Sequence, residues 1–302
     1  MIRPLAVWVL VAVTVGGSRD CPATPRPGDP PQAEWTPEDW RIFESTIRWA
    51  LERRIDTLPQ GAAMARIGER FVGADYIPAT LEVPGPERLV INLRAFDCVT
   101  FVENVIALAW FTRRDGAAAL ADQASARRRY EGYLTTLRYR DGVIAGYPSR
   151  LHYFSEWLGD NARRGNLEVV SGSFGSRLDV EPIGFMSAHP GSYRQMAEPG
   201  VASAIAAIEM QLNARGGRRM VPEEGIAAVA AQIHDGDVIA ATSTLPGLDI
   251  AHTGIAVWHQ GKLHLLHAPL VGKSVERSEQ PLADRIVVIK GQDGIMVGRV
   301  KE

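Results

Sequence analysis

The sequence predicts an α+β protein, with helices in the first two thirds of the chain and antiparallel strands in the last third. Two observations carry this prediction. Apolar residues recur at helical spacing through most of the region before residue 237, and short segments rich in β-branched or alternating residues follow it. With 302 residues, the chain has ample length to build a core.

Composition excludes several classes of protein. Hydrophobic residues make up 46% and charged residues 23%, which is ordinary for a soluble globular chain and untypical of a disordered, fibrous or multi-span membrane protein. Lys and Arg number 33 and Asp and Glu 35, so the net charge is −2. Nothing in this balance favours binding to nucleic acid.

Residues 1–18 are typical of a signal peptide. Arg3 precedes an apolar run of eleven residues, 5–15, and the small Val15 and Gly17 suit cleavage after Gly17. A retained membrane anchor is the less favoured alternative, because the run is short for a bilayer. We therefore expect export to the periplasm or cell envelope, with no stable membrane insertion after cleavage.

Residues 19–37 form a predicted extended linker, since their proline density suits neither a helix nor a central strand. Cys21 lies within it and permits a lipoprotein alternative. The preceding Ser18, Arg19 and Asp20 fit a lipobox poorly, so lipidation is the less favoured hypothesis. A single domain is expected over 38–302.

Helix signals begin at Thr36, which precedes Pro37 at a plausible first helical position. Further helices are predicted by spacing and apolar content, and residues 89–94 suggest a short extended segment. The predicted helices include segments near 64–71, 99–110, 117–138, 151–164 and 201–214.

Strand signals follow residue 236. The predicted strands are 237–241, 252–258, 262–267 and 285–290, and Gln260-Gly261 is expected to join the second and third as a hairpin turn.

Cys98 is expected where an extended segment meets a helix. The helix dipole and the free N–H groups of the first turn would favour the thiolate there, and the same N–H groups can stabilise an oxyanion. A lone cysteine in an apolar helix is more commonly a core residue, so this signal is weak by itself.

His252 and His267 strengthen the cysteine hypothesis. If their strands pair about Gln260-Gly261, the two side chains share one face of the sheet and lie near-opposite. The small Gly254 and Ala256 on that face would let the cysteine helix approach. Cys98, His252 and His267 then form a nucleophile, a base and an orienting group.

A zinc site is a less favoured alternative. His264 and His267 have opposite strand parity, and the sequence has no His-Glu-x-x-His motif. We expect no metal and no cofactor.

Three blocks of sequence resemble a known family. Residues 235–269 resemble the NlpC-type papain-like cysteine peptidases of the bacterial cell wall, and residues 96–104 and 149–154 are closer to the AmiA-like amidases within them. The resemblance covers roughly residues 40 to 300. It implies an NlpC-type core, in which a Cys-bearing helix packs on an antiparallel sheet, and the catalytic residues Cys98, His252 and His267.

The resemblance also implies a reaction, which is hydrolysis of the amide between N-acetylmuramic acid and L-alanine, with anhydro-muropeptides as substrates. A stem-peptide endopeptidase of the same superfamily and a non-catalytic wall-binding protein remain alternatives. The expected partners are peptidoglycan fragments, and the expected state is a monomer.

Two departures from the commoner NlpC-type pattern stand out. Val99-Thr100 follows the cysteine in place of Ser-Gly, and His252 lies 154 positions after Cys98. Extra helices are therefore expected as an insert over 116–225, where they would shape the substrate pocket.

Candidate substrate-binding residues come chiefly from the 149–154 block. Arg150 would hold a peptide carboxylate through two hydrogen bonds, and Tyr153 would stack on or hydrogen-bond a sugar. The alternative is a helix start, with Ser149 as N-cap and Arg150 in solvent. Asp97 is a candidate for substrate contact or, preferably, for the cap of the Cys98 helix, and His152 completes the set.

Overall fold

The computed structural model describes residues 33–270 and 274–302. The predicted signal peptide and most of the predicted linker lie outside the described residues. None of the helices within the described ranges is long and apolar enough to cross a membrane.

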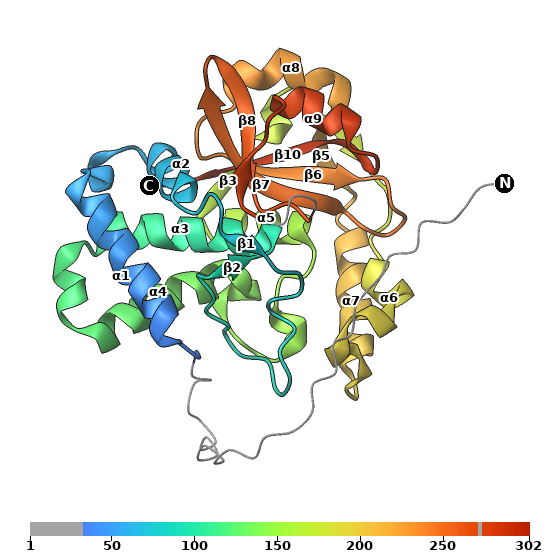
Figure 1. The fold of residues 1–302 in the computed structure, drawn as a ribbon. Coiled ribbons are helices and arrows are strands. Elements are labelled where there is room, and N and C mark those ends of the chain that lie inside the picture. The colour runs from blue at the N-terminus through green and yellow to red at the C-terminus, as the bar shows by residue number, and fades with distance from the viewer. Residues whose placement is uncertain (1–32, 271–273) are drawn as a thin grey trace. The chain divides into compact units, whose positions relative to one another are not determined.

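Helices dominate the first part of the described chain and strands the last part, as the sequence predicts (Figure 1). The helices are α1 (Pro37–Glu52), α2 (Gln60–Glu69), α3 (Cys98–Arg114), α4 (Gln123–Arg138), α5 (Phe154–Arg163), α6 (Phe185–Ala188), α7 (Val201–Asn213), α8 (Ile226–Val229) and α9 (Leu282–Val288). The strands are β1 (Asp75–Tyr76), β2 (Ala95–Phe96), β3 (Leu167–Val169), β4 (Arg177–Asp179), β5 (Arg218–Pro222), β6 (Val238–Ser243), β7 (Ile250–His259), β8 (Lys262–His267), β9 (Glu276–Arg277) and β10 (Gln292–Val300).

The main sheet is antiparallel, with strand order β4-β5-β10-β6-β7-β8-β9 and with β3 also paired to β10. Strands β1 and β2 form a separate parallel pair. The α+β class is therefore confirmed. Its strands come mostly, though not entirely, from the last third of the chain.

Helix α1 begins as expected. Thr36 is its N-cap and forms a capping box with Asp39, and Pro37 occupies the first helical position. Asp39 is buried, and its second oxygen accepts a hydrogen bond from the Leu93 amide at 2.9 Å. The cap thus also anchors the chain segment that leads into β2.

Two layers of side chains cover the two faces of the main sheet. One buried cluster joins helices α1 to α5 to Ile255 and Val257 of β7, and a second joins α8 and α9 to Ala256 and Leu265. In Figure 1, the blue and green helices α1 to α4 accordingly lie on one side of the sheet, with α8 and α9 on the other.

The segment 116–225 contains the expected helices and more. Helices α4 to α7 lie within it, but so do β3, β4 and β5, which extend the main sheet on the side of β10. The predicted helix 117–138 is also interrupted. Asp122 ends a 3₁₀ turn and caps α4 through a hydrogen bond from the Ala124 amide.

The predicted strand 285–290 is wrong, because that segment belongs to α9. Its run of β-branched residues favours a strand locally, but Leu282 and Ile286 lie one helical turn apart and bury together in the second cluster. Pro281 directly precedes the helix. Tertiary packing therefore overrides local propensity here.

Strand β10 was not predicted, although it lies between β5 and β6. Its glycines obscure the strand pattern because they carry no side chain. A Cβ at Gly294 would lie 2.4 Å from the Val221 carbonyl oxygen, and one at Gly298 would lie 2.7 Å from the Leu158 side chain. Both glycines therefore let neighbouring segments of the same chain approach the strand closely.

Candidate active site

Cys98 is the first residue of α3, directly after β2 and Asp97. Asp97 caps the helix in a capping box, since its carboxylate accepts from the Thr100 amide at 2.8 Å and its own amide donates to Thr100 Oγ1 at 3.0 Å. Thr100, which departs from the commoner sequence pattern, is therefore the second member of this box. The cap holds the cysteine at the start of the helix.

Burial favours the neutral form of the Cys98 thiol. Burial raises its pKa to about 12, and the adjacent Asp97 charge adds to the rise. Hydrogen bonds from the backbone N–H groups of Thr253, Cys98 and Val99 oppose it. The N–H groups at the helix end act in the expected direction, toward the thiolate, but desolvation outweighs them.

His252 and His267 lie together on neighbouring strands. His252 Nε2 is 2.8 Å from His267 Nδ1, and the two rings meet edge to face with centroids 4.9 Å apart. The hairpin forms at Gln260-Gly261, where both residues have positive φ. The predicted juxtaposition of the two histidines is confirmed.

Burial favours the neutral form of both histidines too. Burial lowers the pKa of His252 to about 3 and that of His267 to about 2. The positive Arg285 guanidinium of α9 lowers both pKa values further. His252 also lowers the pKa of His267. His267 is completely buried.

Gly254 has a different role from the one expected. It shares a face of β7 with His252, but α3 packs with the opposite face, where Phe101 and Val105 join Ile255 in one cluster. A Cβ at Gly254 would lie 2.8 Å from the Cβ of His267. The glycine thus makes room for the histidine on β8 and not for the cysteine helix.

Cys98 therefore meets β7 at the strand's backbone. The backbone N–H of Thr253, the residue after His252, lowers the pKa of the Cys98 thiol, and α3 packs on β7. Sequence analysis did not identify Thr253 as part of the site, because a backbone contact leaves no side-chain signal. The start of α3 therefore lies next to the β7 backbone at the residue after His252.

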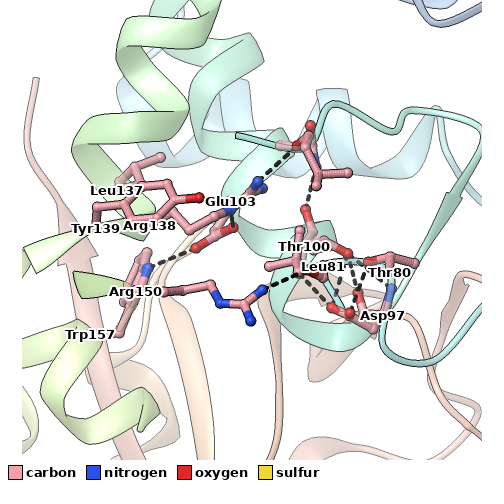
Figure 2. A network of polar contacts seen from close by, with 12 residues as sticks. Thr80, Leu81, Asp97, Thr100, Glu103, Leu137, Arg138, Tyr139, Arg150 and Trp157 are labelled. Carbon is pink, nitrogen blue, oxygen red and sulfur yellow. Dashed lines mark hydrogen bonds and ion pairs between the residues drawn. The ribbon is translucent and has the colours of Figure 1, made fainter. Parts of the chain in front are cut away.

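A buried polar network connects α3 to the inserted helices (Figure 2). Glu103 of α3 accepts from Arg138 Nε at 2.7 Å and from Trp157 Nε1 at 3.2 Å. Arg138 also donates to the Val90 carbonyl oxygen at 2.8 Å. These contacts attach the helix that bears the cysteine to α4, α5 and the segment that precedes β2.

The segment 80–87 joins the same network. Thr80 donates to the second carboxylate oxygen of Asp97 at 3.0 Å, and Arg150 donates to the Leu81 carbonyl oxygen at 2.9 Å (Figure 2). This short segment therefore lies between the N-cap of α3 and Arg150.

Arg150 is neither a solvated residue nor a free carboxylate clamp. Its side chain is buried, and its guanidinium pairs with Glu82 and lies 3.6 Å from Glu87. It also stacks over the Tyr147 ring, with its carbon 4.8 Å from the ring centroid. Protein carboxylates already hold Arg150, which therefore fixes the segment 81–87 in place.

The remaining candidates of the 149–154 block also make internal contacts. Ser149 donates to the Gly146 carbonyl oxygen at 2.7 Å and is not a helix cap, because α5 begins only at Phe154. The Tyr153 hydroxyl donates to Glu209 at 2.6 Å and accepts from the Met186 amide at 2.9 Å.

His152 Nε2 lies 2.9 Å from the Tyr147 carbonyl oxygen. Of the predicted site residues, Asp97 and Cys98 lie together at the start of α3, and His252 and His267 lie together on β7 and β8. The other four fix the inserted helices.

The described residues contain no group of three or more His, Cys, Asp or Glu side chains placed to hold a metal ion. His264, from the zinc alternative, is directed to the Ser278 carbonyl oxygen at 2.8 Å through Nδ1.

The fold and the site together define an amidase-like hydrolase. A family model described as AmiA-like, N-acetylmuramoyl-L-alanine amidase-like, matches residues 66–294, which is more than half of the chain. The chain belongs to this family of cell-wall hydrolases. A search of curated proteins found no match.

Solved structures agree with this assignment. An N-acetylmuramoyl-L-alanine amidase from Bacteroides uniformis is 35% identical, with a TM-score of 0.72, and the match covers 80% of this chain and 99% of that one. A Bacteroides fragilis protein whose description assigns it provisionally to the xylanases is 33% identical, with a TM-score of 0.68 and coverage of 77% and 98%.

A Legionella pneumophila protein is 20% identical, with a TM-score of 0.61 and coverage of 87% and 95%. At this identity the likeness concerns the fold alone.

Proposed function

We propose that the chain is a cysteine-dependent amidase that hydrolyses the bond between N-acetylmuramic acid and L-alanine in peptidoglycan fragments, with anhydro-muropeptides as its substrates. One observation carries the mechanism. Cys98 lies at the N-terminus of α3, which packs on β7, and the backbone N–H of Thr253, the residue after His252, acts on its thiol; His252 is paired with His267. Such a set supplies a nucleophile, a base and an orienting group.

Catalysis begins with proton transfer. Because the pKa of the thiol is raised and that of His252 is lowered, the resting pair is neutral, and His252 removes the Cys98 proton as the sulfur attacks. The sulfur adds to the lactyl carbonyl carbon of the muramic acid. The backbone N–H of Cys98 stabilises the oxyanion.

The tetrahedral intermediate then collapses. The carbon–nitrogen bond breaks, His252 returns the proton to the leaving amine of L-alanine, and a muramoyl thioester remains on Cys98. Water, deprotonated by His252, hydrolyses the thioester. The products are a free stem peptide and a sugar that carries the carboxylate.

We further propose that this machinery is an NlpC-type papain-like core and that the protein works in the periplasm or cell envelope after export. The packing of α3 on β7 supports the first point. The signal-like residues 1–18 support the second.

Product analysis tests the proposed reaction. The protein without residues 1–17 is incubated with a defined anhydro-muropeptide, with and without a chelator, and the products are identified by mass spectrometry. We expect release of the intact stem peptide, unaffected by the chelator. A product that retains L-alanine on the sugar would indicate a stem-peptide endopeptidase, and wall sedimentation without hydrolysis would indicate a binding protein.

The neutral state of the resting thiol predicts slow alkylation with a steep pH dependence. A raised pKa leaves a small thiolate fraction near neutral pH, and this fraction grows about tenfold for each pH unit below the pKa. The rate for Cys98 with iodoacetamide should therefore lie below that of free cysteine at pH 7.5 and still rise beyond pH 9.

The measurement uses the Cys21→Ser protein, so that Cys98 is the single thiol, and follows its mass over time. Free cysteine is the control at each pH. A rate that levels off below pH 8 would show a preformed thiolate–imidazolium pair and contradict the neutral assignment.

A further inference from the structure

The Nε2 nitrogen of His267 has no hydrogen-bond partner, although the residue is completely buried. Its Nδ1 faces His252, so Nε2 points to the other side of the ring, toward the neighbouring strand. A buried ring nitrogen without a partner is costly unless a charged or polar group compensates it. The group in reach is a carboxylate.

That carboxylate belongs to Glu276. Strand β9 pairs with β8 so that Glu276 lies directly across from His267, and Glu276 Oε1 is 3.7 Å from His267 Nε2. Directly paired residues on adjacent strands project on the same face of the sheet. The side chain of Glu276 is 44% exposed and has room to approach.

Two tautomers of the histidine pair are chemically possible, and they differ in function. In the first, His252 carries its proton on Nε2 and donates to His267 Nδ1, so His252 Nδ1 is free to accept the thiol proton. In the second, His267 Nδ1 donates to His252 Nε2, and His252 then carries its proton on Nδ1 and cannot act as the base.

The position of Glu276 distinguishes the two tautomers. In the first, His267 carries its proton on Nε2 and directs it at the carboxylate, which is favourable. In the second, the Nε2 lone pair faces the carboxylate, which is repulsive. The other charged group near the pair is the Arg285 guanidinium of α9, which also interacts with Glu276.

We propose that Glu276 is a positioning residue that holds the His267 proton on Nε2 and thereby keeps His252 in the tautomer that accepts the Cys98 proton. The proposal rests on the amidase mechanism above. Protons move between Cys98, His252 and the leaving amine, while those on His252 Nε2 and His267 Nε2 stay in place. Glu276 acts through the histidines and does not touch the substrate.

Three variants test the proposal. Glu276→Leu removes the acceptor, Glu276→Gln keeps an acceptor oxygen without the charge, and Glu279→Gln is the matched control, because it removes an exposed carboxylate three residues further along. Two readouts are taken for each protein: kcat and KM on an anhydro-muropeptide, and the protonation of the ring nitrogens of His267 by two-bond ¹H–¹⁵N correlation spectra.

For Glu276→Leu we expect kcat to fall by about 10- to 100-fold with KM within about twofold, and the His267 spectrum to change from the Nε2–H form to a mixture with Nδ1–H. Glu276→Gln should recover most of kcat and the Nε2–H form. Glu279→Gln should match the wild type in both readouts.

An unchanged His267 spectrum in Glu276→Leu would overturn the proposal, as would an unchanged kcat. The spectra separate this proposal from the amidase proposal. Should the wild type release no stem peptide, the amidase reaction is refuted, while the tautomer of His267 still tests the role of Glu276. Thermal unfolding of each variant verifies that the fold is retained.

Discussion

Replacing Cys98 with alanine is expected to abolish hydrolysis of anhydro-muropeptides, with a loss of about 10⁴-fold or more in kcat/KM. Removing the nucleophile of a covalent mechanism leaves only the contributions of binding and of the oxyanion site. The fold should be unaffected, because the change removes only the sulfur atom from the first residue of a capped helix. Initial rates by product chromatography measure the effect.

Cys98→Ser is a sharper form of the same test. The hydroxyl keeps the shape of the thiol, but a hydroxyl proton is harder to remove and His252 is a weak base in its buried state. We expect this variant to be nearly as inactive as Cys98→Ala. The matched control is Cys21→Ser, which should retain full activity. Activity of Cys98→Ala within tenfold of the wild type would refute a thioester mechanism.

Breaking the ion pair between Glu103 and Arg138 should cause the largest loss of stability. Both side chains are buried, and burial raises the pKa of Glu103 while Arg138 opposes that rise. Arg138→Met leaves the carboxylate buried without its cation, which costs about 3–5 kcal/mol of unfolding free energy. Urea unfolding measures this loss.

The double variant Glu103→Leu with Arg138→Met should recover much of the loss, because neither charge then remains buried. Arg128→Met is the matched control, since it removes an exposed arginine from the same helix and should change stability by less than about 0.5 kcal/mol. A loss of under 1 kcal/mol for Arg138→Met would contradict the structural role of the pair.

The same variant has a predictable pH dependence. Without Arg138 the pKa of Glu103 in the folded state rises further above its value in the unfolded chain. A raised carboxyl pKa means that the folded state binds the proton more tightly, so the variant loses stability as pH rises from about 4.5 toward the folded pKa. The deficit relative to the wild type should therefore shrink in acid.

This pair also matters for the site. Glu103 lies on the helix that begins at Cys98, and its partners come from α4 and α5. The inserted segment thus supports the nucleophile's helix from behind. The sequence predicted that the insert would shape the pocket, but not that it would hold α3 through a buried charge.

Local chemistry determined much of this protein before any tertiary structure was known. The N-cap residues Thr36 and Asp97 predicted helix starts, and Gln260-Gly261 predicted the hairpin. Each of these signals acts within a few residues, through hydrogen bonds or backbone conformation. The hairpin then brought His252 and His267 onto one face, because side chains alternate along paired strands.

Tertiary structure decided what local signals do not contain. The β-branched run 286–288 became part of α9 because Leu282 and Ile286 bury against the sheet. The glycine-rich β10 became a central strand because its partners require close approach. Arg150 is buried because Glu82 and Glu87, which lie more than 60 residues earlier in the chain, form ion pairs with its guanidinium.

Tertiary structure also decided the pKa values of the site residues. A helix N-terminus by itself favours a thiolate, and a strand histidine by itself titrates near neutral pH. Burial raises the pKa of the Cys98 thiol, against the helix end, and lowers the pKa of His252 far below neutral pH. Burial depends on how the whole fold packs. The sequence by itself determined the pairing of His252 with His267 and the place of Cys98 at a helix start. The packed fold determined the electrostatics of these groups and placed Glu276 beside His267, because both depend on contacts between segments far apart in the chain.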